Sequence, residues 1–552
     1  MLITSAYILV ALLLLGSFSY SEIMVRQFLQ GQDLFIACAL ILLWFAMARR
    51  PATGVDFSSL RLSNTGFWLS CSALLLLGWV GHWLVLHGYH FSRDEQMAVM
   101  DARIFSNGDL IARLPDFWRE THDSLNVIFT VESLRGYAWL SSYRPVNALF
   151  QMLFGSWSSP FFSALGLWAT WRIAIRLWPE NREAHWVAVL LYAMSAQIFL
   201  LSMTSYAMAG HLGLNMLWLW LFLHDRWYSH VAAITVGLAA TGLHQLVYHP
   251  LFAGPILALI LWQRRWWLAA FYAGAYALII MLWALWLKLP LAMVDEPLAI
   301  VTRDTDSFFL TRLSWALEEL SWENIAVQSA NMVRFFTWQH ALMLPLLLVG
   351  VRAALTSRKP LYWAFIGVLI TTIMVKLLLR PYQGHGWGYR YMHGLMGVAV
   401  LLATLGWVEL RARNLLSQTQ WRIATAFTAL AIIPWYLWQA SSLSGVFADL
   451  SERLDRQNVD LLIIDDDAGP FAVDLVTNDP YLANRPLRLR GSTLEPDDID
   501  RLCQRYTVSF MTVAEYGALM RKFNWGNREA SSYMAPLIAR ADALSCTVSL
   551  RQ

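Results

Sequence analysis

The residues of this chain best suited to acid–base chemistry stand together just after its third apolar run. Asp94 and Glu95 open a polar stretch, residues 87–145, in an otherwise apolar chain. A carboxylate at the edge of a membrane is partly desolvated, which raises its basicity toward that of a general base. Because adjacent side chains on a helix diverge by about 100°, we expect one of the two to face a site. The alternative is a pair that only caps the helix beginning there.

The stretch that follows the acidic pair is predicted to be a helix. Asp94 and Asp101 lie seven residues apart and therefore share one face. An apolar stripe runs beside them, formed by Met97, Ala98, Ala102 and Phe105. This pattern is typical of an amphipathic helix lying on a membrane, with Asp101 as a further candidate substrate contact.

A second polar cluster combines glycine, aromatic rings and arginine between residues 380 and 394. Three of its glycines fall within five residues and allow close backbone approach. Arg390 follows as the chain re-enters the membrane, where an arginine can bind phosphate through two parallel hydrogen bonds. We expect Arg390 to bind a phosphate, with Tyr389 beside it and His385 as a sugar or phosphate contact. The alternative is an arginine that only reaches the interface among aromatic residues.

Polar residues also interrupt an apolar segment near residue 245. His244, Gln245 and His249 there are substrate or headgroup contacts, metal ligands, or helix-packing residues, since polar groups at membrane depth tend to line cavities. The spacing of five between the histidines is poor for one helical face and no third ligand is evident, so no metal is assigned. Arg144 is a second candidate for the phosphate, or else an interfacial anchor.

Composition sets the fold class. Hydrophobic residues make up 57% and charged residues 14% of the 552 residues, which predicts a polytopic α-helical membrane protein. A net charge of +3 with scattered basic residues excludes nucleic acid as a partner. The apolar runs predict about thirteen spans of roughly 20 residues each, near 4–24, 33–48, 66–86, 156–178, 185–203, 208–224, 230–246, 248–263, 266–288, 339–356, 361–379, 391–409 and 421–440.

Basic residues follow alternate predicted spans. Because cytoplasmic loops are enriched in lysine and arginine, this pattern places the N-terminus inside. It places outside the loops 87–155, 204–208, 289–338 and 380–390, the turn near His249, and the tail from about residue 441. We expect a transmembrane domain over residues 1–440, whose outward loops are 87–155 with its interfacial helix and 289–338. A soluble periplasmic α/β domain follows over residues 441–552.

The tail has the pattern of a small α/β domain. Residues 459–464 read as a buried strand, 485–490 as an edge strand and 507–511 as a further strand, with a helix starting at Pro496. Asp465, Asp466 and Asp467 follow the first strand as a solvated turn or, less simply, a cation site. Cys503 and Cys546 either form a disulfide in an oxidising periplasm or stay as two buried thiols.

The acidic pair directly after a membrane helix resembles that of the GT-C class of polyprenyl-phosphate-sugar glycosyltransferases. That class includes the protein O-mannosyltransferases and the lipid A aminoarabinose transferases of bacteria. The segment Tyr389-Arg390-Tyr391 is similar to their later outward Arg-Tyr segment near the lipid phosphate, and many members end in a soluble outward domain. Two extra spans precede the acidic loop here, which departs from the common pattern but preserves sidedness.

The resemblance implies a bacterial inner-membrane enzyme that moves a sugar from a polyprenyl-phosphate donor to a glycan, lipid or protein acceptor on the periplasmic face. Asp94, or Glu95 in its place, would take the acceptor proton with inversion at the anomeric carbon, and Arg390 or Arg144 would stabilise the leaving phosphate. No cofactor is implied, although some relatives with paired acids use a divalent cation. The rival hypothesis is a transporter or flippase of lipid-linked saccharides, for which an internal repeat with broken helices is expected and not found.

Overall fold

The computed structural model describes residues 1–21, 23–49, 63–125, 129–131, 134, 136–294, 320–379, 386–526 and 528–550. The chain forms two compact units. Unit 1 comprises Met1–Val85, Phe154–Ala284 and Asp306–Ala440, and unit 2 comprises Leu86–Leu153, Leu285–Thr305 and Ser441–Gln552.

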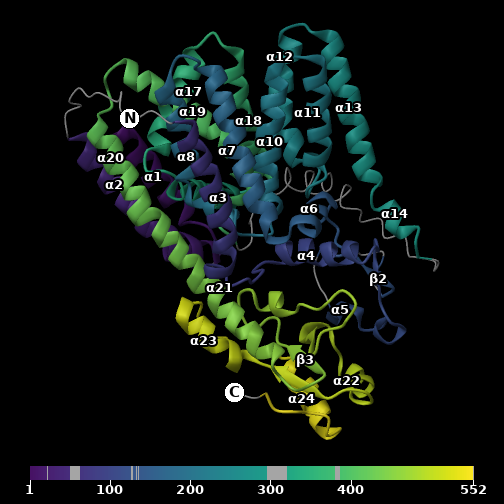
Figure 1. Ribbon diagram of the computed structural model, residues 1–552. Helices are drawn as coiled ribbons and strands as arrows, with labels where there is room; N and C mark the ends of the chain where they lie inside the picture. The colour runs from purple at the N-terminus through teal and green to yellow at the C-terminus, as the bar shows by residue number, and fades with distance from the viewer. Residues whose placement is uncertain are drawn as a thin grey trace. The chain divides into compact units, whose positions relative to one another are not determined.

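Unit 1 is helical, and many of its helices lie side by side (Figure 1). Its helices are α1 Leu2–Gly16, the π-helix η1 Ile23–Asp33, α2 Leu34–Ala48, α3 Asn64–Leu84, the 3₁₀ turn η4 Gly155–Trp157, α7 Ser158–Leu177, α8 Arg182–Ala193, α9 Ala196–Leu201, α10 Ala207–His224, α11 Trp227–Thr241, α12 Tyr248–Trp262, α13 Trp266–Leu285, α16 Trp322–Thr337, α17 Met343–Thr356, α18 Pro360–Leu378, the 3₁₀ turn η5 Arg390–Leu395, α19 Met396–Ala412, α20 Gln418–Phe427 and the π-helix η6 Thr428–Ile432. Helix α21, Ile433–Asp455, continues from unit 1 into unit 2.

Six helical segments among the described residues are long and apolar enough to cross a membrane. They are Met24–Ala48, Asn64–Leu84, Trp266–Leu291, Pro360–Leu378, Arg390–Ala412 and Gln418–Asp455. The shorter apolar helices α1, α12 and α17 accompany them. A multi-pass membrane protein is therefore confirmed, while the number of about thirteen spans stays a prediction.

Two parts of unit 1 differ from the sequence prediction. The first predicted span, 4–24, is a helix only to Gly16, and the next helical segment, η1, begins at Ile23 rather than at 33. Residues 322–337, predicted as part of an outward loop, form α16, which packs against α1 and η1. The predicted segment Asp295-Glu296-Pro297 lies outside the described residues.

Helices α17 and α19 pack closely through two glycines. A Cβ atom at Gly350 would lie 1.8 Å from the Leu402 carbonyl oxygen, and one at Gly406 would lie 2.0 Å from the Leu346 carbonyl oxygen. Small residues at such crossings are the usual basis of helix association in membranes. Helices α12 and α18 also contact each other, and with η5 they carry the polar cluster described below.

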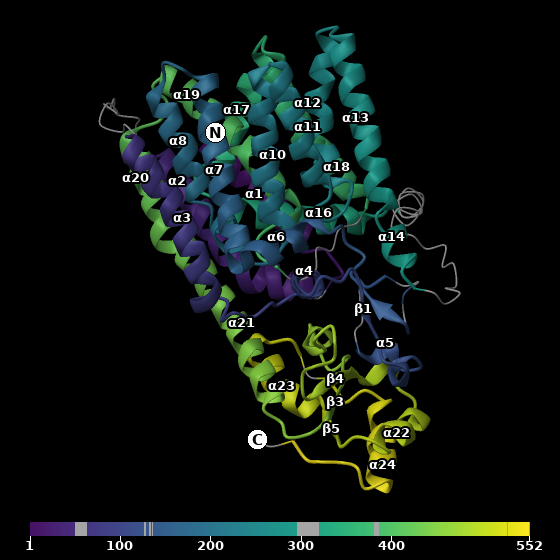
Figure 2. The same cartoon turned by 45° about the vertical axis from the view of Figure 1, so that its right-hand side comes forward.

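Unit 2 combines several helices with a parallel sheet (Figure 2). Its elements are α4 Arg93–Ser106, β1 Ala112–Arg113, the 3₁₀ turn η2 Asp116–Trp118, α5 His122–Leu125, β2 Ala138–Trp139, α6 Val146–Phe154, α14 Lys288–Leu291, β3 Leu461–Ile464, the 3₁₀ turn η7 Ala472–Leu475, β4 Leu487–Arg490, the 3₁₀ turn η8 Gly491–Thr493, α22 Pro496–Cys503, β5 Val508–Met511, α23 Val513–Phe523 and α24 Met534–Ala543. The strand order β4-β3-β5 puts the predicted buried strand in the centre and the predicted edge strand at an edge. The predicted strands of the tail are present, while a separate periplasmic domain over residues 441–552 stays a prediction.

The core of unit 2 joins α4 to the tail. Met97, Met100 and Ile104 of α4 pack in one apolar cluster with Ile463 of β3 and Phe510 of β5. Met97 was predicted to face a membrane, and it faces this core instead because the sheet offers it an apolar surface. Cys503 and Cys546 form a disulfide, with their Cα atoms 5.6 Å apart.

Candidate active site

Helix α4 begins where the acidic pair predicts it. The Ser92 side chain accepts a hydrogen bond from the Glu95 backbone N–H at 3.4 Å, so Ser92 is the N-cap. Acidic residues in the first turn further stabilise the helix through its dipole. Glu95 is buried with 1% of its surface exposed, whereas Asp94 is partly exposed. Of the two carboxylates, Asp94 is the more accessible to a substrate.

Both acids of one face of α4 receive hydrogen bonds from a single segment. The Tyr143 hydroxyl donates to Asp94, while the backbone N–H and the hydroxyl of Ser141 donate to Asp101, the backbone N–H at 3.0 Å. Asp94 and Asp101 thus share a face, as predicted. They attach residues 141–143 to α4, and the buried Arg144 follows directly.

Asp101 is buried rather than open to solvent. Burial raises the pKa of its carboxyl from 3.8 to about 7, although the two hydrogen bonds from Ser141 act in the opposite direction. Because both of its oxygens accept bonds from Ser141, the geometry favours a positioning role for Asp101. Substrate contact by Asp101 stays a prediction.

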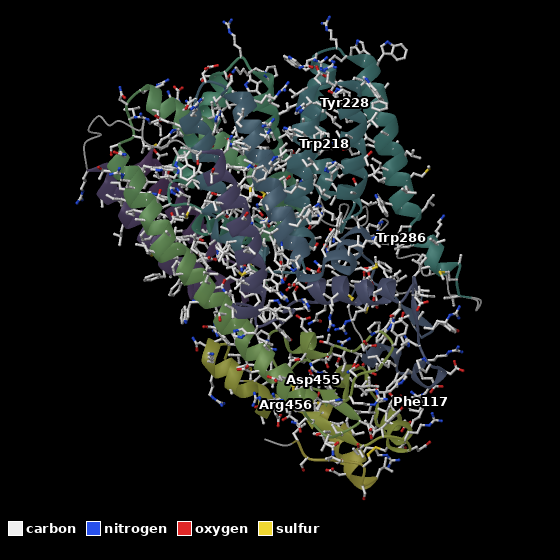
Figure 3. The ribbon with its side chains drawn as sticks, viewed as in Figure 1. Phe117, Trp218, Tyr228, Trp286, Asp455 and Arg456 are labelled. Atoms are coloured by element: carbon white, nitrogen blue, oxygen red, sulfur yellow. A yellow bond between two sulfur atoms is a disulfide. The ribbon has the colours of Figure 1, made fainter. Side chains whose placement is uncertain are left out.

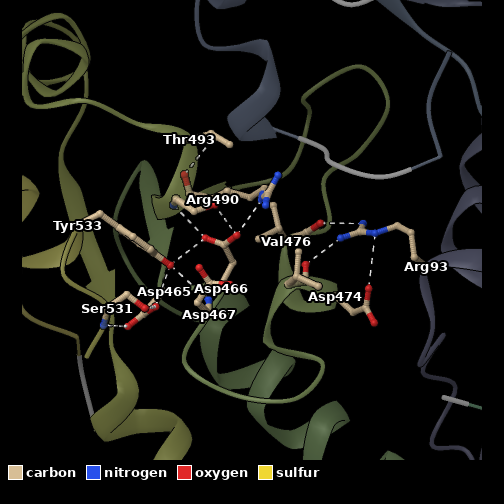
Figure 4. A network of polar contacts seen from close by, with 12 residues as sticks. Arg93, Asp465, Asp466, Asp467, Asp474, Val476, Arg490, Thr493, Ser531 and Tyr533 are labelled. Atoms are coloured by element: carbon tan, nitrogen blue, oxygen red, sulfur yellow. Dashed lines mark hydrogen bonds and ion pairs between the residues drawn. The ribbon is translucent and has the colours of Figure 1, made fainter. Parts of the chain in front are cut away.

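Arg93 ties the start of α4 to the tail. Its guanidinium donates to the carbonyl oxygens of Val476 at 2.9 Å and Val473 at 2.8 Å and lies 3.7 Å from the Asp474 carboxylate (Figure 4). The side chain is 3% exposed, and a buried charge needs such partners. The position of the acidic pair on α4 is thereby set by residues nearly 400 positions later in the chain.

The glycine-rich segment of unit 1 is held by a side-chain amide. Gln197 of α9 donates to the Tyr389 carbonyl oxygen at 3.0 Å and accepts from the Tyr389 backbone N–H at 3.2 Å. Gly388 has φ +64°, and a Cβ there would lie 2.6 Å from Gln197. This confirms a close backbone approach at Gly388. The other part of the cluster, residues 380–385 with His385, lies outside the described residues.

Tyr389 points away from solvent. It is fully buried, and its hydroxyl donates to the Gln328 side chain at 3.0 Å. The Arg334 guanidinium donates to the Gly386 carbonyl oxygen. These bonds fix the backbone that leads into η5, so Tyr389 is placed to position Arg390.

Two buried cations come together at the start of η5. Lys376 of α18 and Arg390 are each 5% exposed. The Lys376 ammonium lies 4.0 Å from the Tyr391 ring centroid, and the Arg390 guanidinium lies 5.6 Å from the same centroid. Lys376 also donates to the Tyr248 hydroxyl at 3.3 Å.

No carboxylate neutralises Lys376 among the residues that the structure describes. Cation–π contacts of this kind are worth about 2 kcal/mol when desolvated, which is less than the cost of burying an ammonium group. Lys376 therefore favours an anion as a bound ligand, and phosphate provides oxygens for such a contact.

The predicted histidines have different surroundings. His249 is fully buried, with one ring nitrogen 2.8 Å from the Asn215 side-chain oxygen and the other 2.6 Å from the Tyr276 hydroxyl. This arrangement matches the helix-packing alternative. His244 is buried beside Tyr248, with ring centroids 5.9 Å apart, whereas Gln245 is exposed.

In the described part of the chain, no group of three or more His, Cys, Asp and Glu side chains is arranged to hold a metal ion. Two of the three acids in the turn after β3 are buried, contrary to the predicted solvated turn, whereas Asp467 is exposed. Asp465 and Asp466 are buried and accept hydrogen bonds from Ser531, Tyr533 and Arg490 (Figure 4). The bond from Arg490 to Asp466 joins the end of β4 to the turn after β3.

Solved structures similar to this chain include two crystal structures of ArnT from Cupriavidus metallidurans. The one bound to undecaprenyl phosphate is 12% identical with a TM-score of 0.49, covering 87% of this chain and 88% of that chain. The apo structure is 12% identical with a TM-score of 0.43, covering 85% and 90%. ArnT is a GT-C lipid A aminoarabinose transferase, the class that the sequence resembles. No family model and no curated protein matches the chain.

Lys376 is the functional candidate that sequence reasoning missed. It stands inside the predicted span 361–379, and an ionisable residue within a span is by itself a sign of function. That signal was available, but the proximity of Lys376 to Tyr248, which is 128 positions earlier, depends on the packing of α12 against α18.

Proposed function

We propose that this chain is a membrane glycosyltransferase that moves a sugar from a polyprenyl-phosphate donor to an acceptor hydroxyl on the periplasmic face of the bacterial inner membrane. The observation that carries the proposal is the buried ammonium group of Lys376, which lies beside the same Tyr391 ring as the Arg390 guanidinium. A lipid phosphate supplies the anion that Lys376 favours, and its polyprenyl tail suits a helical membrane unit. The ArnT structure with bound undecaprenyl phosphate suggests the kind of lipid.

Each step of the proposed transfer reaction is assigned to a residue of the chain. Asp94 accepts the proton of the acceptor hydroxyl as its oxygen attacks the anomeric carbon, and Tyr143 holds that carboxylate in place. The bond from the anomeric carbon to the phosphate oxygen breaks, so the configuration inverts. Lys376 and Arg390 stabilise the charge that grows on the leaving phosphate. Glu95 and Arg144 remain the substitutes for Asp94 and Arg390.

Two variants test binding and transfer separately. Lys376→Met is expected to lower the affinity for undecaprenyl phosphate by about 10- to 100-fold, because it removes a charge-assisted contact worth roughly 1.5–3 kcal/mol. Asp94→Asn is expected to bind that lipid like the wild type while losing transfer by roughly 10²- to 10⁴-fold. Binding to the purified full chain is measured by native mass spectrometry, and transfer with a set of undecaprenyl-phosphate hexoses and pentoses.

Lys359→Met is the matched control, since Lys359 is an exposed lysine at the N-terminus of the same helix, α18. It should bind and transfer like the wild type. Unchanged lipid affinity in Lys376→Met would remove the cation pair from the donor site. Movement of the lipid-linked sugar across a vesicle membrane without transfer would favour the transporter instead.

A further inference from the structure

Unit 2 contains a cavity that the proposed reaction does not use. Its volume is about 590 Å³, within the roughly 300–1,000 Å³ of small-molecule sites. Helix α4, the end of α21 and residues 477–488 form its walls. Asp94 and Asp101 do not line it, because the lining positions of α4, among them Arg93, Gln96 and Met100, lie on another face of the helix.

One wall of the cavity contains the buried Arg488, whose Nε–H makes no hydrogen bond to a described residue. Arg488 is 2% exposed and donates to the Leu475 carbonyl oxygen at 2.9 Å and to the Asp455 carboxylate at 2.7 Å. Asp455 stands at the end of α21 (Figure 3). The Nε–H of Arg488 finds no acceptor among the described residues. A buried donor without an acceptor is costly, and this unsatisfied N–H belongs to a residue that lines the cavity.

The remaining polar groups offer both donors and acceptors. Tyr89 lines the cavity, and its hydroxyl makes no hydrogen bond to any described residue. At the rim Arg103 and Asp479 lie 3.5 Å apart, with 60% and 25% of their side chains exposed. Asn478 and Asn484 add amide groups, and Met97 and Pro480 add apolar surface.

This combination selects one class of ligand. A phosphate would call for donors alone, whereas this lining also contains the carboxylates of Asp455 and Asp479. A lipid chain would leave the polar groups without partners. A saccharide matches, because each hydroxyl both donates and accepts and the C–H faces of the ring can pack on apolar side chains.

We propose that this cavity binds a saccharide, as a subsite for the part of the acceptor glycan that is remote from the reacting hydroxyl. The assignment of this saccharide to the acceptor rests on the proposed function, whereas the binding of a saccharide does not. If the chain binds a saccharide in this cavity but transfers no sugar, the binding site is supported and the proposed transferase function is contradicted.

The experiment measures retention of the detergent-solubilised full chain on an array of bacterial oligosaccharides. Ala483→Trp places a large side chain at the exposed edge of the cavity and is expected to lower retention on the order of tenfold or more through steric exclusion. Tyr89→Phe removes one hydroxyl and should lower retention by about 3- to 10-fold. Ala543→Trp, at an exposed alanine of α24 outside the cavity, should bind like the wild type.

Thermal unfolding of each variant shows that the fold is kept. Equal retention of Ala483→Trp and wild type would overturn the proposal, and so would retention of no array saccharide by the wild type. Retention restricted to phosphorylated glycans and abolished by inorganic phosphate would show an anion site instead, and would likewise overturn it.

Discussion

The two acids on one face of α4 have different environments despite sharing a face. Asp94 is partly exposed and accepts a hydrogen bond from the Tyr143 hydroxyl, whereas Asp101 is buried and accepts two from Ser141. A proton acceptor in catalysis must reach its substrate, which favours Asp94. Asp101 is better placed to hold residues 141–144 against the helix.

The raised pKa of Asp101 predicts a pH dependence of stability. Its value is about 7 in the folded chain and ordinarily 3.8, so the folded state binds the proton more tightly. The contribution to stability is therefore fully present below about pH 4 and is lost as the pH rises through about 7. Asp101→Asn carries no charge to bury, so its unfolding midpoint should fall less than that of the wild type between pH 5 and pH 8.

Thermal unfolding of the solubilised full chain at four pH values measures this difference. Asp109→Asn is the control, since Asp109 is an exposed acid close to the end of α4. Its curve should run parallel to that of the wild type. A parallel curve for Asp101→Asn as well would show that burial of Asp101 does not control its protonation.

At the scale of elements, the short turn η5 depends on a backbone conformation. Gly388 occupies the left-handed region at φ +64° beside Gln197, and Arg390 begins η5 two residues later. The Gln197 amide bonds to both backbone groups of Tyr389. The position of the Arg390 guanidinium thus depends on a contact between α9 and this turn.

Gly388→Ala should disturb this contact. The left-handed conformation alone costs a residue with a Cβ about 1–2 kcal/mol, and the added atom would meet Gln197 at 2.6 Å. We expect a lower unfolding midpoint and weaker binding of undecaprenyl phosphate, by several-fold. Gly254→Ala in α12 is the control, because nothing lies within 4 Å of the added Cβ there. Lipid affinity in Gly388→Ala equal to that of the control would show that the turn does not position Arg390.

At the scale of the whole molecule, the cysteines report on the compartment of the tail. The Cys503–Cys546 disulfide closes a loop with a sequence separation of 43, and disulfides persist in oxidising compartments. The other two cysteines, Cys38 and Cys71, are free. The pattern agrees with the proposed periplasmic position of unit 2.

Thiol alkylation of chain taken directly from cells tests this position. We expect two further thiols to react after reduction, and Cys503→Ser with Cys546→Ser to lower the free energy of unfolding of unit 2 by about 2–4 kcal/mol. Cys38→Ser should change neither the disulfide nor this stability. Reduced Cys503 and Cys546 in cells would place the tail in the cytoplasm and contradict the proposed orientation.

Features that depend on local pattern and composition could be predicted from the sequence. The apolar runs predicted a membrane protein, the acidic pair after Ser92 predicted the start of α4, and short strand-like segments predicted β3, β4 and β5. Helix caps, strands and apolar spans depend on neighbouring residues in the chain, so they could be predicted from the sequence.

The contacts between polar groups of distant segments depend on tertiary packing and could not be predicted. Lys376 and Tyr248 are far apart in the sequence, and so are Arg93 and Asp474, yet each pair is in contact. The apolar stripe on α4 was predicted to face a membrane, but it packs in the core of unit 2. In a membrane protein the lipid-facing and protein-facing sides of a helix are both apolar, so hydrophobic pattern does not specify the neighbours of a helix. Close packing does, and it brought Lys376 beside Arg390.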